Sequence, residues 1–492
     1  FGSSGGGGTN PFGSSGGGTN PLTQVHAPTG RGATAAASRR RMHLGQQRQQ
    51  HSDHHSAFTS TAYLNMESRD WDELHLDEFN RSGEEQSAMS SGKRYYVKSP
   101  FQFRKTGQSG ADMNTLWENL ADVADDLCFY RGLQVDSVNH PTANYHVNTG
   151  NRFGGDPAIG SWVTQGLGTE NENLPGFVVL ASGGKTPSAG KSLWGSGFLP
   201  TLYQGVQCRT DGGDPILYLS DPKGLSRKAR RKTIDALKDL NEYQHKHVGD
   251  PETLTRISQY ELAFRMQMSV PETMDLSKEP EHILKLYGAK PGHVSAAESA
   301  ADPRRLYKGN DPTFANNCLL ARRLVENGVR FVQLYDWGWD HHGSSPGESI
   351  DETLPIKCQQ IDRAIAGLVT DLKQRGLFEE TLIVWGGEFG RTPMMQNNVN
   401  STLKKGFYGR DHHPHAFTMW MAGAGIKPGA YGQTDDIGYY IAENPVGIRD
   451  FQSTILHLIG LDPHRFSFPF QGLKNRLIGP TEEGKVIGGI LA

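Results

Sequence analysis

Acidic and histidine side chains gather at the end of one apolar segment, in the stretch YDWGWDHHG. The stretch follows the apolar run FVQLY, so its polar groups come directly after a predicted strand. These groups are Asp336, Asp340, His341 and His342. Carboxylate and imidazole groups are suitable ligands for zinc, manganese and similar divalent ions. The stretch is therefore either a metal site or a polar turn.

Two further clusters of this kind accompany other predicted strands. Glu388 follows the apolar run TLIVWGG, and the segment GRDHHPH precedes the apolar run AFTMWMAG. The candidate ligands in that second segment are Asp411, His412 and, as an alternative, His413. A single cluster is weak evidence, because a capped turn uses the same residue types. Three clusters next to strands of one sheet favour a metal site.

Two arginines, Arg391 and Arg410, lie beside these clusters in the sequence. A guanidinium group can hydrogen-bond two oxygens of a phosphate or sulfate group at once. The alternative is that the arginines neutralise the nearby acids Glu388 and Asp411. The sequence leaves both roles open.

A fourth candidate segment is DSVNHPTANYHVNTG, in which His140 directly precedes Pro141. Proline is frequent in the first turn of a helix, so we predict that a helix begins here. Because a helix N-terminus favours an anion, His140 is a further candidate for the site.

The remaining segments alternate between strand and helix patterns. The predicted strands are 128–133, 175–182, 330–335, 381–387 and 416–423. Apolar residues at helical spacing predict helices over 114–127, 251–268, 318–325 and 361–372. This alternation, with buried strands, is typical of an α/β fold with a largely parallel sheet. In such sheets, ligands bind beyond the carboxyl ends of the strands.

The composition fits a large globular domain. The net charge of −3, from 50 basic and 53 acidic residues, does not favour nucleic acid as a partner. There is no run of about 18 apolar residues, so we expect no membrane span. The four cysteines form no CxxC pair, which argues against a zinc–thiolate site. The sequence makes no prediction of the oligomeric state.

Residues 1–88 are predicted to be a low-complexity, mostly disordered segment. The segment opens with the near-duplicate FGSSGGGGTNP and FGSSGGGTNP. Glycine- and serine-rich sequence of this kind cannot bury enough apolar surface to offset the entropy cost of ordering. The later run HSDHH is interpreted as a solvated tract rather than a metal site. We therefore predict a single folded domain over 89–492.

Several long strings in this domain are similar to a known family. They include SVNHPTANYHVNTG, GSWVTQGLGTENENLPGFVVL, CLLARRLVENGVRFVQLYDWGWDHHG, DLKQRGLFEETLIVWGGEFGRTP and GRDHHPHAFTMWMAGAGIKPGAYGQTDDIG. On these strings, the chain resembles the bacterial proteins of the domain-of-unknown-function 1501 family, in the alkaline phosphatase and sulfatase superfamily. The resemblance covers roughly four-fifths of the chain.

The resemblance implies a three-layer α/β/α sandwich with a largely parallel sheet, of the alkaline phosphatase kind. It also implies a metal-dependent hydrolase of sulfate or phosphate esters, acting on small-molecule or glycan esters. The cofactor would be one or two divalent ions, with zinc, calcium, magnesium and manganese all open. By analogy, the metal ligands would be Asp340, His342, Glu388, Asp411 and His412, with Asp336, His341 and His413 as alternatives. Catalytic roles would fall to His140, as base or ligand, and to Arg391 and Arg410, as groups that hold non-bridging oxygens.

Two features depart from the pattern of that superfamily. A Ser, Thr or modified Cys nucleophile is expected nine residues before a Thr-Gly pair, and counting back from Thr149 gives His140. An N-terminal strand is expected to be followed by a glycine-rich turn and a metal-binding aspartate. The stretch TAYLNMESRDWDELHLD stands there without the turn. Its substitute ligands would be Asp70, Asp72 or Asp77. Both departures favour an alternative: a catalytically impaired domain that binds anionic glycans or surface material.

The resemblance also implies an exported or periplasmic protein, since family members are commonly exported. The run SRRR resembles the start of a twin-arginine signal, but the apolar segment that should follow it is absent. We therefore predict no intact signal peptide in this sequence.

Overall fold

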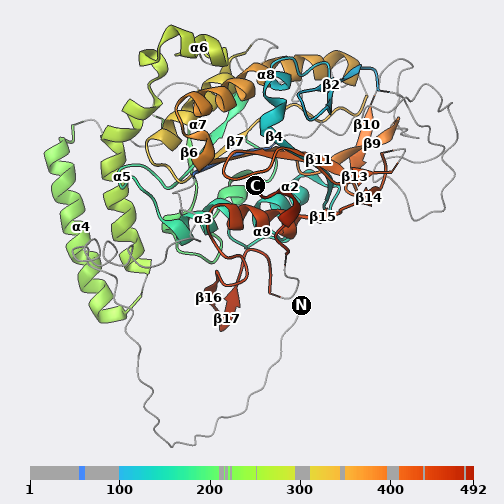
Figure 1. Ribbon diagram of the computed structural model, residues 1–492. Helices are drawn as coiled ribbons and strands as arrows, with labels where there is room; N and C mark the ends of the chain where they lie inside the picture. The colour runs from blue at the N-terminus through green and yellow to red at the C-terminus, as the bar shows by residue number, and fades with distance from the viewer. Residues whose placement is uncertain are drawn as a thin grey trace, which may run out of the picture. The chain divides into compact units, whose positions relative to one another are not determined.

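The computed structural model of the chain has a central sheet with helices on both faces (Figure 1). All the residues that it describes belong to the compact unit Ser52–Ala492. They are 55–60 (backbone only), 99–184, 186–209, 215–216, 220–221, 224–250, 252–293, 311–343, 349–395, 409–435, 438–480 and 484–492. None of the helices in these ranges combines the length and apolar character needed to cross a bilayer.

The central sheet has the strand order β12-β4-β11-β8-β1-β7-β5-β6, with β15 also paired to β4. Its strands are β1 (His55–Ser60), β4 (Leu127–Gln134), β5 (Phe177–Ala181), β6 (Val206–Cys208), β7 (Phe331–Tyr335), β8 (Thr381–Gly386), β11 (Phe417–Ala422), β12 (Gly429–Tyr431) and β15 (Val446–Gly447). Neighbouring strands are parallel except for β11, which is antiparallel to both β4 and β8. The predicted largely parallel sheet is confirmed.

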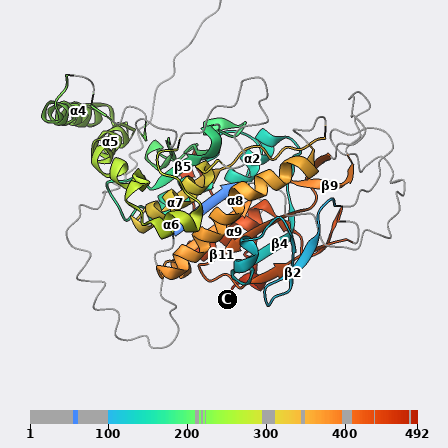
Figure 2. The ribbon, with the colours of Figure 1, turned by 90° about the horizontal axis from the view of Figure 1, so that it is seen from above.

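Helices form a layer on each face of this sheet. Figures 1 and 2 show α6 (Glu281–Tyr287), α7 (Thr313–Glu326) and α8 (Ile350–Gln374) over one face. The other face carries α2 (His140–Thr149), α3 (Ile159–Leu167) and α9 (Ile448–Leu458). Successive side chains of a strand point to opposite faces, and β4, β5, β7, β8 and β11 each contribute to both cores. The three-layer α/β/α prediction is confirmed.

The alternation is visible in β7. Its residues Val332 and Leu334 belong to the core under α7 and α8, whereas Phe331 and Tyr335 belong to the core under α2, α3 and α9. A further pair of helices, α4 (Arg227–Val248) and α5 (Glu252–Met274), packs together at the side of the sheet away from β9 and β10 (Figures 1 and 2).

The predicted elements agree with the structure except in one segment. The segment 114–127 does not form the predicted α-helix. It follows the strand β3 (Ala111–Asn114) and contains the 3₁₀ helix η1 (Leu120–Asp126). The reason lies in a distant side chain, because the carboxylate of Asp362 on α8 accepts the backbone N–H groups of Asn119 and Leu120. Those contacts fix the backbone locally, and propensity is overridden by tertiary structure.

β1 is a strand that the sequence analysis did not predict. Its sequence, HSAFTS, lies within the segment 1–88, yet it pairs with β7 and β8 in the middle of the sheet. Central strands of parallel sheets are usually continuous apolar runs, and only Ala57 and Phe58 are apolar here. The stretch 61–98, with its three candidate aspartates, lies outside the described residues. The domain boundary at residue 89 stays a prediction.

The strand directions bring the candidate residues to one edge of the sheet. Ser60 at the end of β1 pairs with Tyr335 of β7 and Gly386 of β8, so these three carboxyl ends are level. Because β11 is antiparallel to β8, the residues that precede β11 lie at the same edge. The segment after β4 leads from this edge into α2.

Candidate metal centre

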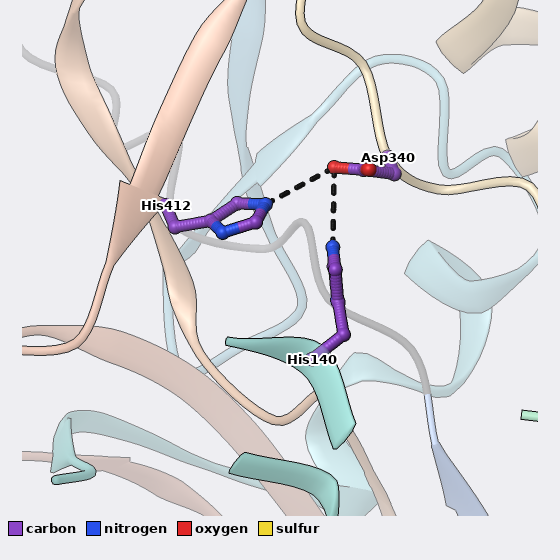
Figure 3. A group of neighbouring side chains, drawn as sticks. All are labelled: His140, Asp340 and His412. Atoms are coloured by element: carbon purple, nitrogen blue, oxygen red, sulfur yellow. Dashed lines mark hydrogen bonds and ion pairs between the residues drawn. The ribbon is translucent and has the colours of Figure 1, made fainter. Parts of the chain in front are cut away.

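Three side chains from separate elements meet at this edge of the sheet. His140 is the first residue of α2, Asp340 lies in the loop after β7, and His412 belongs to β10 (Arg410–His413). Each offers one ligand atom, and the three atoms lie within 4.8 Å of one another (Figure 3). Two imidazole nitrogens and a carboxylate oxygen form a donor set that suits a divalent transition-metal ion.

One oxygen, Oδ1 of Asp340, is the point on which the surrounding groups converge. The Nε2 atoms of His140 and His412 lie 3.3 Å and 3.2 Å from it. The Nε2 atom of His342 and the Nη2 atom of Arg391 each lie 2.7 Å from it. Burial would raise the pKa of Asp340, but the Arg391 guanidinium and the imidazoles hold it well below its ordinary value. The side chain is therefore a carboxylate.

The far nitrogen of each ligand histidine is bound to an oxygen. Nδ1 of His140 lies 2.5 Å from Oε1 of Glu388, and Nδ1 of His412 lies 2.6 Å from the carbonyl oxygen of Val138. A carbonyl oxygen can only accept, so Nδ1 of His412 carries the proton, and Nε2 of the neutral ring has a lone pair. An outer oxygen that fixes the tautomer in this way is typical of histidines that bind metals.

Two imidazoles face the carboxylate of Asp340. Burial lowers the pKa of His412, so its neutral form presents the Nε2 lone pair to the Asp340 carboxylate. Nε2 of His140 is buried and lies 3.3 Å from Oδ1 of Asp340. Burial alone would lower the pKa of His140, but its hydrogen bonds to Asp340 and Glu388 raise it to about 9. The residues present therefore fit a bound divalent ion.

Local structure holds the two histidines in place. Asn139 is extended, Pro141 occupies the first turn of α2, and Ser137 Oγ accepts the N–H of Asn139, so the helix begins at His140. The buried ring of Phe389 packs against both imidazoles, with ring centroids 4.8 Å from His140 and 4.4 Å from His412. The sequence analysis did not single out Phe389. The one sequence feature that pointed to it is its position directly after the candidate ligand Glu388.

A hairpin of β9 (Gly390–Met395) and β10 supplies the next contacts. The antiparallel register pairs His412 with Arg391, which brings the guanidinium to the ligand group. The loop after β7 docks on the same hairpin, because Arg410 N–H donates to the carbonyl of His341 at 3.1 Å. Gly409 allows this approach, since a Cβ atom there would lie 1.9 Å from the carbonyl oxygen of His342.

The structure does not place every predicted ligand in the group of three. Glu388 contacts the outer nitrogen of His140 instead of lying among the ligand atoms. The carboxylate of Asp411 accepts the backbone N–H of His412 at 2.7 Å. Arg410 donates to the carbonyl of Thr392. The described contacts of Asp411 and Arg410 thus support β10 and its partner strand.

The three alternative ligands also have other surroundings. Asp336 pairs with Lys357 at 2.9 Å and accepts the indole N–H of Trp339. His341 is buried, which lowers its pKa to about 3. Nε2 of His413 lies 2.6 Å from the carbonyl oxygen of Tyr439, and burial lowers the pKa of His413 to about 4. None of these three belongs to the ligand group found among the described residues.

Comparison with known proteins gives one strong match and several weak ones. The sequence model of a family described as "Protein of unknown function (DUF1501)" matches residues 34–491. No curated protein sequence matches the chain.

Among solved structures, the PsFucS1 sulfatase from Pseudoalteromonas sp. is 12% identical with a TM-score of 0.33, over 75% of this chain and 67% of its own. A protein in the alkaline phosphatase superfamily from Vibrio parahaemolyticus is 11% identical with a TM-score of 0.32, over 74% and 63%. The alkaline phosphatase of the Antarctic bacterium TAB5 is 10% identical with a TM-score of 0.30, over 69% and 89%. Likenesses this weak transfer no activity to the chain.

Proposed function

Because the chain belongs to the DUF1501 family, described as proteins of unknown function, we propose a function from its own residues: metal-dependent hydrolysis of phosphate or sulfate esters. The observation that carries the proposal is the meeting of His140, Asp340 and His412 within 4.8 Å. Each of the three comes from a different element at the carboxyl edge of the sheet, where α/β proteins bind their ligands.

Each residue of the site has a distinct role in this proposal. The ion is held by His140, Asp340 and His412. His342 offers a fourth ligand atom, since its Nε2 lies 2.7 Å from Oδ1 of Asp340. Glu388 and the carbonyl of Val138 orient the two ligand imidazoles. When bound, the ion polarises the ester oxygen and stabilises the charge that develops during hydrolysis.

The donor set favours particular ions. Calcium and magnesium prefer ligand sets made of oxygen atoms, whereas imidazole nitrogen suits zinc, and manganese can use the carboxylate of a mixed set. His140 and His412 both present nitrogen, and His342 adds a third imidazole at 2.7 Å from Asp340. We therefore propose zinc or manganese rather than calcium or magnesium.

Two features support an anionic substrate. Arg391 places a buried guanidinium at the ligand group, where it can hold non-bridging oxygens of the ester. The N-terminus of α2, which favours anions, begins at His140 in the same site. In this proposal water attacks the ester directly, because His140 stands where the superfamily pattern has its nucleophile.

The test combines metal analysis with an activity screen. The purified chain is expected to contain zinc or manganese by mass spectrometry and to hydrolyse aryl phosphates or aryl sulfates. Asp340→Ala should lose both the metal and the turnover. Glu379→Ala is the matched control, because Glu379 is an exposed acid at the opposite end of β8. A chain without bound metal, or turnover that survives Asp340→Ala, would reject the proposal.

A second candidate is binding of anionic glycans without turnover. It is favoured by the presence of His140 where the superfamily pattern has a Ser, Thr or Cys nucleophile. Arg391 and the histidines would then form an anion site rather than a catalytic one. Retention of a sulfated polysaccharide that stays intact after long incubation with the metal-loaded chain would select this candidate over hydrolysis.

A further inference from the structure

A buried ion pair lies at the base of the loop that carries Asp340. The loop begins directly after β7 with Asp336, whose side chain is 1% exposed and lies 2.9 Å from Nζ of Lys357 on α8. The indole N–H of Trp339 donates to the same carboxylate at 2.6 Å. Nζ of Lys357 also lies 5.4 Å from the centre of the Trp339 ring. Asp336, Trp339 and Lys357 therefore contact one another.

Besides the contacts of Asp340 itself, described contacts hold both the first and the last part of the loop. The cluster holds its first part to α8, and the hydrogen bond from Arg410 N–H to the carbonyl of His341 holds its last part to β10. Asp340 lies between these two attachments. The loop contains no helix or strand between residues 336 and 343, and Gly338 and Gly343 have positive φ angles of 95° and 74°. Its course therefore depends on side-chain contacts.

We propose that Lys357 is a positioning residue for the metal centre: through Asp336 and Trp339 it fixes the loop that presents Asp340 and His342 to the ion. This inference rests on the proposed metal site but concerns a residue outside it. It also gives the buried acid Asp336 a structural role, in place of the alternative that Asp336 is itself a ligand.

Burial of this pair is otherwise difficult to explain. Removing two charges from water is costly, and an apolar pair of similar size would often be as stable. An ion pair is more directional than an apolar contact, since the amine must meet the carboxylate at a defined distance. Lys357 lies near the start of a helix of 25 residues, which is a rigid support for such a contact. A pair of this kind suits a loop whose ligand atoms must be placed accurately.

The same helix provides a matched control. Asp371 lies about 21 Å further along α8, at about 1.5 Å of rise per residue. It is also buried and pairs with a buried base, Arg322 of α7, at 2.9 Å. Replacing Lys357 or Arg322 by Met removes one buried positive charge and keeps an unbranched apolar side chain. Only Lys357→Met changes the loop that carries Asp340.

The experiment measures the dissociation constant for zinc and for manganese by calorimetry, together with the thermal midpoint of the metal-free chain. Both variants should lower the thermal midpoint. Lys357→Met should also weaken metal binding by about tenfold or more, as the loss of outer contacts around metal ligands generally does. Arg322→Met should leave the dissociation constant unchanged. Lys357→Arg keeps the charge and should recover most of the lost affinity.

Two further measurements keep the inference open to refutation. If Lys357→Met does not fold, Trp339→Phe removes the N–H donor to Asp336, together with part of the ring, while Lys357 stays in place, and it should still weaken metal binding relative to the wild type. Wild-type affinity in Lys357→Met, or in Trp339→Phe where that variant is used, overturns the positioning role while leaving the proposed metal site intact. A wild-type chain that binds neither metal overturns the proposed function, and the inference with it.

Discussion

Replacing Glu388 by Gln or by Ala separates two effects that its carboxylate has on His140. The carboxylate accepts a hydrogen bond from Nδ1 at 2.5 Å, which turns Nε2 toward the metal position, and its negative charge makes the imidazole a better donor. Gln keeps an oxygen that can accept this hydrogen bond but loses the charge. Ala loses both. The side chain of Glu388 is only 13% exposed, so water does not readily take its place.

Glu388→Ala should therefore lose more metal affinity than Glu388→Gln. Removing an outer partner of a metal ligand costs about 10- to 100-fold in metal affinity. We expect about tenfold for Glu388→Gln and about 100-fold for Glu388→Ala, which correspond to about 1.4 and 2.7 kcal/mol. Both values refer to calorimetric titration of the metal-free chain with zinc or manganese.

The pH of the titration matters for this comparison. Burial opposes protonation of His140, but its bonds to Asp340 and Glu388 raise its pKa to about 9, so a proton competes with the metal below that pH. Removing Glu388 lowers this pKa and weakens the competition, which offsets part of the loss at pH 7. The full loss of metal affinity should appear near pH 9, where the proton no longer competes strongly. Glu379→Gln, at an exposed position, should change nothing, and wild-type affinity of Glu388→Ala at pH 9 would refute the role assigned to Glu388.

Three other changes test the contacts around the site and the core. Asp411→Asn should leave the metal dissociation constant unchanged in the same titration, because asparagine can still accept the backbone N–H beside it. A measurable loss would return Asp411 to the set of ligands. Gly409→Ala should lower the free energy of unfolding in urea by about 1–3 kcal/mol, because its Cβ would clash with the His342 carbonyl. Glu279→Gln should cost about 3 kcal/mol at pH 7. Burial would raise the pKa of Glu279, but its bonds to Arg323 and Arg322 lower it, so this stability is present above its ordinary value of 4.5 and is lost at lower pH. Denaturation at pH 7 and pH 4 should show the difference between wild type and variant shrinking, and an equal difference at both would contradict the assignment.

The meeting of distant segments could be anticipated from the sequence because polar clusters follow apolar runs. Asp340 comes just after β7, and Glu388 comes just after β8, whose carboxyl ends are level in a parallel sheet. His140 was recognisable from the proline that follows it and opens α2. These signals lie within short stretches of sequence, so they can be recognised without a structure.

The role of each residue at the edge depended on contacts that sequence spacing does not encode. Asp336 and Asp340 are four residues apart in the same loop, and the ion pair of Asp336 with Lys357 on the following helix is what distinguishes the two acids. Glu388 and His140 both lie at the edge of the sheet. Phe389 packs against the His140 ring, and the Glu388 carboxylate contacts Nδ1 of that ring, on the side away from Nε2. The first strand, β1, was missed because two apolar residues do not mark a central strand.

The direction of β11 decides whether the site can exist at all. His412 precedes β11, so in an all-parallel sheet it would lie at the amino edge, across the width of the domain from Asp340. The run FTMWMA is buried throughout and fits either direction equally well. Because β11 is antiparallel to β8 and β4, it starts at the carboxyl edge, and the hairpin of β9 and β10 that precedes it places His412 beside Asp340. The meeting of His412 and Asp340 therefore depends on the mixed character of the sheet, because His412 reaches this edge just before the reversed strand.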